Sequence, residues 1–192
     1  MNRVTALGVP VGVELRESRN GVLYATGALA YRAGGRFARV PLVGFGILAE
    51  RLHALQGVPT VLGGYLQEYQ DEGMRRMQVV VQEAFGVERE TFTAPLGHPV
   101  VDGYARAEVS GIVAQDPTPL VGAVGLRVAV RYPMGTRHGE TFVPLVVLGG
   151  KVEEWEKGDR IFAEGGLVAR KDRPERVDLL VGRIEKARRE VA

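Results

Sequence analysis

The sequence predicts an all-β protein with two tandem five-stranded antiparallel barrels, each with a short helix between its third and fourth strands. The first observation is a repeated pattern, in which residues 40–43 (VPLV) return at 143–146 and residues 63–66 (GGYL) return at 165–167 (GGL). The two offsets are 103 and 102 residues, so order and spacing are both kept. The second observation is a series of short apolar alternations broken by Gly- and Asn-containing turns, which is typical of antiparallel strands. A period of this length is too long for a solenoid and fits two copies of one compact domain.

In the first copy, turn signals separate five strands. Asn20-Gly21 marks a turn between two apolar runs, because both residues tolerate positive φ. Leu48, Leu52 and Leu55 share one face of a helix. We expect a first strand before this turn, then strands at 22–32, 36–45, 61–69 and 75–83, with the helix at 48–55.

The second copy repeats this order. Strands are expected at 106–115, 121–132, 140–148, 159–170 and 176–185, with a short helix at 151–157. The predicted boundaries are 1–85 for the first domain, 86–104 for a linker containing Pro and Gly, 105–187 for the second domain and 188–192 for a short tail. Five short antiparallel strands with a helix after the third match the OB-fold, a small barrel whose face binds oligonucleotides or oligosaccharides.

The composition excludes several classes of protein and of site. The 192 residues include no cysteine, which excludes disulfides and thiolate metal sites. No apolar run approaches the ~20 residues of a membrane helix, and the N-terminus lacks the apolar core of a signal peptide. We therefore expect a cytoplasmic protein with no membrane partner. The net charge is only +2, with 21 Arg against 4 Lys, so a polyanionic partner depends on where the arginines lie.

Motifs for catalysis or for a cofactor are sparse. The histidines, at positions 53, 98 and 138, lack metal-ligand spacing, and no serine lies in a G-x-S-x-G pattern. Residues 44–49 (GFGILA) fit the dinucleotide pattern G-x-G-x-x-A after a strand. A doubly wound sheet, however, needs crossover connections of about a dozen residues or more. The rest of the chain instead predicts short strands and hairpins, which argues against a dinucleotide site. We expect no enzyme, no cofactor and no metal.

The first 83 residues carry an ordered set of family motifs. Asn2-Arg3-Val4 opens the chain, Asn20-Gly21 precedes the second strand, and residues 45–50 (FGILAE) end the third. Gly64-Tyr65-Leu66 follows in the fourth strand, and residues 71–76 (DEGMRR) form the next hairpin. This set resembles the bacterial single-stranded DNA-binding protein family, which the second half matches only in outline. Two OB domains in one chain resemble the variant of the family that dimerises to present four OB-folds. The resemblance implies single-stranded DNA as a partner and a homodimer as the assembly.

Two departures limit what the resemblance implies. The family's disordered tail ends in acidic residues and Pro-Phe and recruits replication and repair proteins, whereas this sequence ends in residues 188–192 (RREVA). The family also stacks bases on several tryptophans, whereas the one tryptophan here is Trp155, which we expect to plug the end of the second barrel. The resemblance therefore implies replication or repair proteins as further partners, but the family motif that recruits them is missing.

Alternation along the strands predicts which side chains face outward. If Val40 and Leu42 fill the first barrel, then Phe37, Arg39 and Phe45 point out. Single-strand binding needs this combination, with aromatic faces for unstacked bases and cations for phosphates. The same residue types can instead form a solubilising surface or a dimer interface. The predicted DNA-binding residues are Arg3, Arg32, Phe37, Arg39, Phe45, Tyr65, Tyr69, Arg75 and Arg76 in the first domain and Arg127, Arg131 and Phe142 in the second.

The function predicted from the sequence is largely sequence-independent binding of single-stranded DNA in replication, recombination or repair. It would use base stacking and contacts between arginines and phosphates. The alternative is an OB-fold scaffold that contacts replication or repair proteins and binds DNA weakly or not at all. The low aromatic content, at 7%, and the missing tail favour this alternative.

Overall fold

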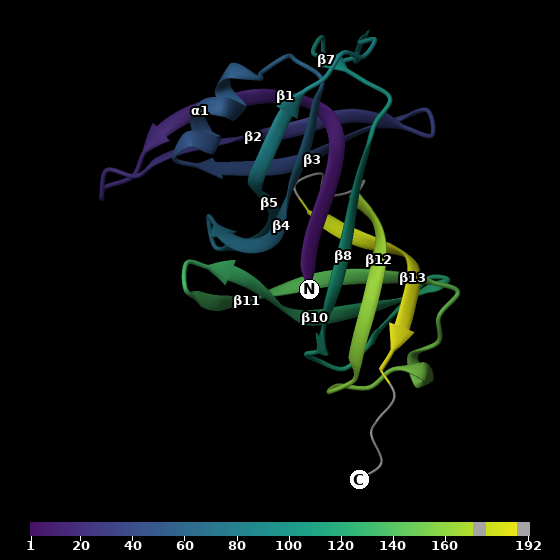
Figure 1. Cartoon of the computed structure of the whole chain (residues 1–192). Helices are drawn as coiled ribbons and strands as arrows, with labels where there is room; N and C mark the ends of the chain where they lie inside the picture. Colours follow the sequence, from purple (N-terminus) through teal and green to yellow (C-terminus); the bar gives the residue numbers. More distant parts are fainter. Residues whose placement is uncertain (171–175, 188–192) are drawn as a thin grey trace.

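The computed structural model describes residues 1–170 and 176–187, and most of their strands form two barrels (Figure 1). Barrel 1 contains β1 (Asn2–Glu17), β2 (Leu23–Ala33), β3 (Arg36–Phe45), α1 (Ile47–Ala54), β4 (Thr60–Asp71) and β5 (Met74–Gly86). Barrel 2 contains β8 (Tyr104–Val113), β10 (Ala123–Met134), β11 (Arg137–Leu148), η1 (Val152–Glu154), β12 (Arg160–Ala169) and β13 (Val177–Lys186). The short strands β6 (Phe92–Thr93), β7 (Pro99–Val100) and β9 (Thr118–Leu120) lie outside these rings. The tail predicted at 188–192 lies outside the described residues.

Each barrel is a closed ring with the same strand order. In barrel 1, β1, β2, β3, β5 and β4 pair in turn, and β4 returns to β1. In barrel 2, β8, β10, β11, β13 and β12 pair in turn, and β12 returns to β8. One pair in each ring is parallel, β3 with β5 and β11 with β13, and the others are antiparallel. The predicted fold class, all-β with OB-type barrels, is confirmed.

The repeated sequence patterns occupy equivalent strands, β3 and β11 for VPLV and β4 and β12 for the glycine pair. Gly64 and Gly165 both lie at a bulge in their strands. A Cβ at Gly64 would be 2.1 Å from the carbonyl oxygen of Val80, and one at Gly165 would be 2.0 Å from that of Leu180. Backbone atoms cannot yield this space, so only glycine fits. The repeated glycine therefore allows the close approach of β4 to β5 and of β12 to β13 at the bulge in each barrel.

A short helical segment covers one end of each barrel. In barrel 1, α1 packs Leu52 into the core, and a Cβ at Gly44 would be 2.7 Å from Leu52 Cδ1. Gly46 starts the helix with φ of 56°, so these two glycines serve helix packing rather than a dinucleotide site. Barrel 2 has only the 3-10 turn η1 where the sequence predicts a helix at 151–157. Trp155 packs against the core beside it, as expected.

The connection between the barrels folds onto barrel 1. β6 and β7 pair as a small hairpin at its middle. Ala94, Val100 and Val101 are buried together with Leu7 of β1 and Ala30 of β2, in a second apolar cluster outside the ring. The predicted linker is therefore a cover for the outer face of β1 and β2 rather than an exposed spacer.

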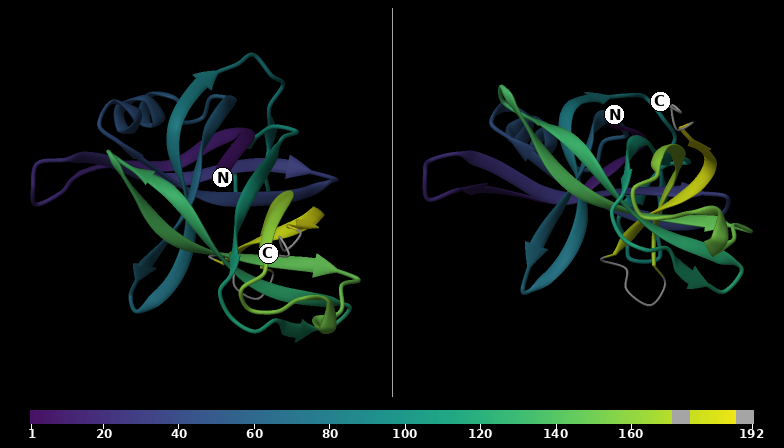
Figure 2. Two further views of the ribbon diagram at one scale, coloured as in Figure 1. Left: turned by 60° about the horizontal axis from the view of Figure 1, so that its bottom comes forward. Right: turned by 90° about the horizontal axis from the view of Figure 1, so that it is seen from below.

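The two barrels are joined edge to edge within one chain. Residues 2–7 of β1 pair with residues 104–109 of β8, which makes one continuous 11-stranded sheet. Tyr31 is buried in barrel 1 and donates its hydroxyl to the carbonyl oxygen of Leu167 in barrel 2, at 3.1 Å. Burial raises the pKa of Tyr31 to about 12. The β4–β5 and β10–β11 hairpins project from the two barrels to the same side (Figure 2).

Candidate nucleic-acid interface

β3 presents the aromatic and cationic side chains that the alternation predicts. Val40 and Leu42 are buried in barrel 1. Phe37 and Phe45 face the other way and are each 47% exposed, and Arg39 between them is also exposed. A half-exposed aromatic ring can receive an unstacked base. The predicted orientation of β3 is confirmed, while DNA contact by these residues stays a prediction.

A groove of about 580 Å³ lies against the Phe37 end of this face. Phe37, Arg39 and Pro41 of β3 line one side, and His98 of the connection and Arg170 at the end of β12 line the other sides. Burial, and then the neighbouring charge of Arg39, lower the pKa of His98. The groove thus combines an aromatic surface with guanidinium groups from both barrels.

Arg32 fastens the connection to β2. Its guanidinium pairs with both carboxylate oxygens of Asp102, at 2.6 and 2.9 Å, and lies 4.0 Å from the centroid of the Phe92 ring. The hydrogen bond from Arg32 lowers the pKa of Asp102. These contacts give Arg32 a structural role that the sequence does not predict, and its predicted contact with DNA stays untested.

A second hollow, of about 360 Å³, lies between the two barrels, and we call it the arginine cleft. Among the described residues, two carboxylates line it, Glu68 and Asp178. The arginines that line it in the same part of the chain are Arg75 and Arg76 of barrel 1 and Arg127, Arg170 and Arg176 of barrel 2. The cleft therefore gathers cations from two domains that lie far apart in sequence.

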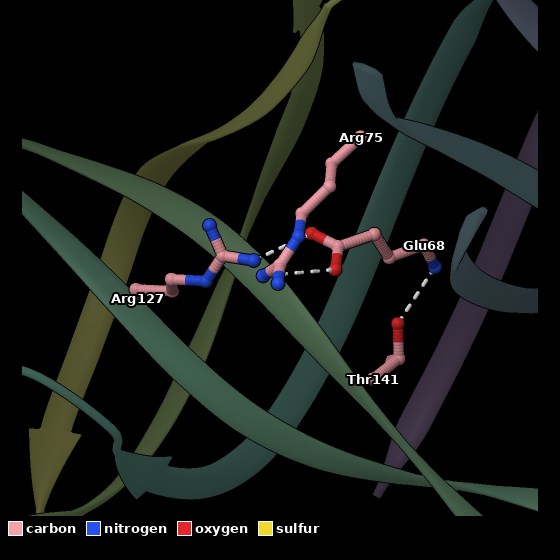
Figure 3. A network of polar contacts seen from close by, with 4 residues as sticks. All are labelled: Glu68, Arg75, Arg127 and Thr141. Carbon is pink, nitrogen blue, oxygen red and sulfur yellow. Dashed lines mark hydrogen bonds and ion pairs between the residues drawn. The ribbon is translucent and has the colours of Figure 1, made fainter. Parts of the chain in front are cut away.

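Glu68 occupies the cleft between cations of the two barrels. In Figure 3 the guanidinium groups of Arg75 and Arg127 converge on its carboxylate. Arg127 Nη2 lies 2.7 Å from Oε2, and Arg75 Nη1 lies 3.7 Å from Oε1. The backbone N–H of Glu68 donates to Thr141 Oγ1 at 2.6 Å. Because Arg127 and Thr141 belong to barrel 2, this network ties β4 to β10 and β11.

Arg170 connects the groove and the arginine cleft, since it lines both. Its guanidinium lies 2.5 Å from Asp178 on β13, which holds it at the boundary between the two hollows. Arg170 therefore lies where the two hollows adjoin.

The predicted tyrosines and the hairpin arginines are partly used within the protein. Tyr65 stacks on Tyr132 of barrel 2, with ring centroids 5.6 Å apart and planes 9° apart. Burial, and then the neighbouring Tyr132, raise the pKa of Tyr65. Tyr69 is half-buried, and Arg76 pairs with Asp71 at 2.8 Å. One face of Tyr65 is thus covered, which leaves less of the ring for a base.

The remaining predicted residues lie at separate places. Val128 is buried, and Arg131 on the same strand is exposed, as the alternation predicts. The Phe142 ring lies 5.2 Å from the guanidinium of Arg127 and is half-buried. Arg3 is exposed on β1, where it pairs in register with Glu108 of β8. These positions do not gather the predicted residues into one surface.

Sequence reasoning missed several residues of the two hollows, namely Glu68, His98, Arg170 and Arg176. The repeat contained a signal for one of them. Val79 of β5 and Leu179 of β13 hold equivalent pairing positions, so Arg176 is the counterpart of Arg76. Arg76 is one of the DNA-binding residues predicted from the sequence. Glu68 carried no such signal, because its partner Arg127 is 59 residues away.

The comparisons with known proteins agree with this architecture. No protein-family model and no curated protein matches the chain. Among solved structures, the wild-type single-stranded DNA binding protein from Thermus aquaticus is 18% identical, with a TM-score of 0.69 over 100% of this chain and 95% of that chain. A deletion mutant of that protein gives a TM-score of 0.65 at 18% identity, over 100% of this chain and 97% of that chain. At this identity the likeness shows a shared fold along the whole chain.

Within residues 1–170 and 176–187, no group of three or more His, Cys, Asp or Glu side chains is placed to hold a metal ion. Nor does any helix described there have the length and apolar character needed to cross a membrane.

Proposed function

We propose that this chain binds single-stranded DNA largely without sequence preference, as a non-enzymatic relative of the bacterial single-stranded DNA-binding proteins. The observation that carries the proposal is that two adjoining hollows share Arg170. Phe37 and Arg39 of β3 line the groove with it, and the other arginines line the arginine cleft with it. The full-length fold likeness to the Thermus aquaticus protein supports it. Replication, recombination or repair in the cytoplasm is the proposed setting. The homodimer expected from the sequence is part of the proposal, and light scattering at micromolar concentrations tests it.

The proposed mechanism divides the work between two kinds of contact. Unstacked bases lie on Phe37 and Phe45, and each stack contributes about 1–3 kcal/mol. Guanidinium groups of Arg39, Arg170 and the other arginines of the arginine cleft neutralise phosphates. Because every base has an aromatic face and every nucleotide a phosphate, neither contact reads the base sequence. A paired duplex keeps its bases stacked, so it loses the first contribution.

Fluorescence anisotropy of a labelled oligo-dT strand tests the proposal. We expect tighter binding to the single strand than to a duplex of equal length, and similar affinity for mixed-sequence strands. The affinity should fall with salt, with a log–log slope of about −0.7 for each phosphate neutralised. Equal affinity for duplex and single strand would reject stacking as the source of binding.

The second candidate function is a protein-interaction scaffold of replication or repair machinery. Ion pairs within the chain favour it, because Arg32, Arg76 and Arg127 each pair with a carboxylate. Under this candidate the oligo-dT strand shows weak binding or none at low salt. The same anisotropy titration therefore discriminates the two candidates.

A further inference from the structure

The arginine cleft holds more positive than negative charge, yet an acid of the protein itself lies between two of its cations. In the described part of the chain, the lining carries five arginines against two carboxylates. Glu68 lies within reach of Arg75 and Arg127, and its side chain is only 19% exposed. A carboxylate held in this way between cations of two barrels has the position that an external anion would take.

The chemistry of the Glu68 carboxylate matches one particular anion. A carboxylate and a phosphodiester each carry one negative charge shared by two oxygens, and guanidinium groups bind both with the same fork of N–H donors. The two oxygens of Glu68 face different arginines, Oε2 toward Arg127 and Oε1 toward Arg75. A phosphodiester in the same place could contact the same pair of cations.

We propose that Glu68 is a built-in competitor for a phosphodiester subsite in the arginine cleft, formed by Arg75, Arg127 and Arg176. A single strand that crosses from β3 of barrel 1 to barrel 2 places a phosphate there and displaces the carboxylate. The inference rests on the proposed function and deepens it, since it assigns the crossing point and a residue that lowers affinity. The backbone contact of Glu68 to Thr141 is independent of its carboxylate, so the barrels stay tied when the carboxylate moves.

The test compares Glu68→Gln with Glu14→Gln in the anisotropy titration with labelled oligo-dT. Each variant removes one negative charge that pairs with an arginine, and Glu14 pairs with Arg16 at 2.6 Å on the exposed part of β1, outside the cleft. Loss of the competing ion pair should tighten binding by Glu68→Gln about tenfold. The salt slope should stay near the wild-type value, because in both proteins the bound strand contacts the same arginines once the carboxylate is displaced or absent. Glu14→Gln should leave both affinity and slope at the wild-type values.

A second variant examines the arginines that the subsite would use. Arg176→Ala should weaken binding and flatten the slope by about 0.7. Arg51→Ala is the matched control, because Arg51 is an exposed arginine on α1 and does not line the cleft. Circular dichroism and thermal unfolding establish that each variant is folded.

The outcomes separate the inference from the proposed function. If wild type binds and folded Glu68→Gln binds equally well or more weakly, the competitor is rejected while DNA binding stands. If Arg176→Ala behaves like Arg51→Ala, the subsite is rejected in the same way. If wild type does not bind but Glu68→Gln does, the inference is supported, because the acid alone blocks the cleft. If neither binds, the inference and the proposed function both fail.

Discussion

The two barrels share one strand order and differ in what they expose. On β3 of barrel 1, the outward positions carry Phe37, Arg39 and Phe45. The counterparts on β11 of barrel 2, at the 103-residue offset of the repeat, are Glu140, Phe142 and Leu148. The inward residues and the bulge glycine are instead alike. Ring closure therefore constrains inward positions, while the outward positions are open to change in charge and aromatic content.

This difference gives the barrels different parts in the proposed function. Barrel 1 supplies half-exposed rings on which bases can stack, and barrel 2 supplies three of the arginines that line the cleft. Two kinds of change test this difference between the barrels. One is to disturb the closure that the barrels have in common, and the other is to change the outward residues that distinguish them.

The largest effect is expected at the bulge glycines. In Gly165→Ala the new Cβ would meet the carbonyl oxygen of Leu180 at 2.0 Å, so barrel 2 must open or shift its backbone. We expect the free energy of unfolding to fall by about 3 kcal/mol. Gly64→Ala should do the same in barrel 1. Urea unfolding, followed by circular dichroism and by the fluorescence of Trp155, measures both.

The neighbouring glycine of β12 is the control for this pair. A Cβ at Gly166 would have Ala105 O as its nearest neighbour, at 4.0 Å, so Gly166→Ala should be neutral or slightly stabilising. Because Trp155 packs on the core cluster that the barrels share, Gly64→Ala should shift its fluorescence midpoint too if the barrels unfold together. Equal stability of the Gly165 and Gly166 variants would contradict the closure argument.

The second effect is on DNA affinity and separates the outward faces. Phe45→Ala removes a ring that is 47% exposed, and should weaken oligo-dT binding by about 1–3 kcal/mol at every salt concentration with little change of slope. Leu148→Ala is the matched variant in barrel 2, where the side chain is 64% exposed and offers no stacking face, so affinity should not change. If folded Phe45→Ala binds like wild type, barrel 1 does not use this face, and the protein-interaction candidate gains weight.

Much of the fold was predictable because it depends on local patterns. Alternation placed Val40 and Leu42 inside and Phe37 outside, and each strand of the two rings lies where the turn signals indicated. The helix expected at 151–157 shrinks to one 3-10 turn, because the backbone is already extended at Trp155, with φ of −129° and ψ of 145°. The three-residue β9 was missed, since its Pro119 is unfavourable in a strand.

The candidate site was less predictable because it depends on how the barrels meet. Arg32 and Asp102 are 70 residues apart, and their pairing follows only once the connection has folded onto β2. The arginine cleft requires β4 to lie beside β10 and β11, which alternation along single strands cannot indicate. The sequence therefore identified cations of the cleft, such as Arg75 and Arg127, but not the acid between them.

The smallest effect concerns one of the hydrogen bonds between the two barrels, the one made by Tyr31. Tyr31→Phe removes the bond to the Leu167 carbonyl, and should lower the free energy of unfolding by about 1 kcal/mol at neutral pH. The pKa of Tyr31 is raised by burial to about 12, above the ordinary value of 10, so the stability it contributes is complete below pH 10 and is lost as pH rises toward 12. The variant has no such loss, so its stability should approach and then exceed that of wild type in this range. Tyr104→Phe, at an exposed tyrosine, should follow the wild-type curve. Urea unfolding between pH 8 and pH 12 measures the three curves, and a constant gap between Tyr31→Phe and wild type across that range would show that Tyr31 is not the titrating group.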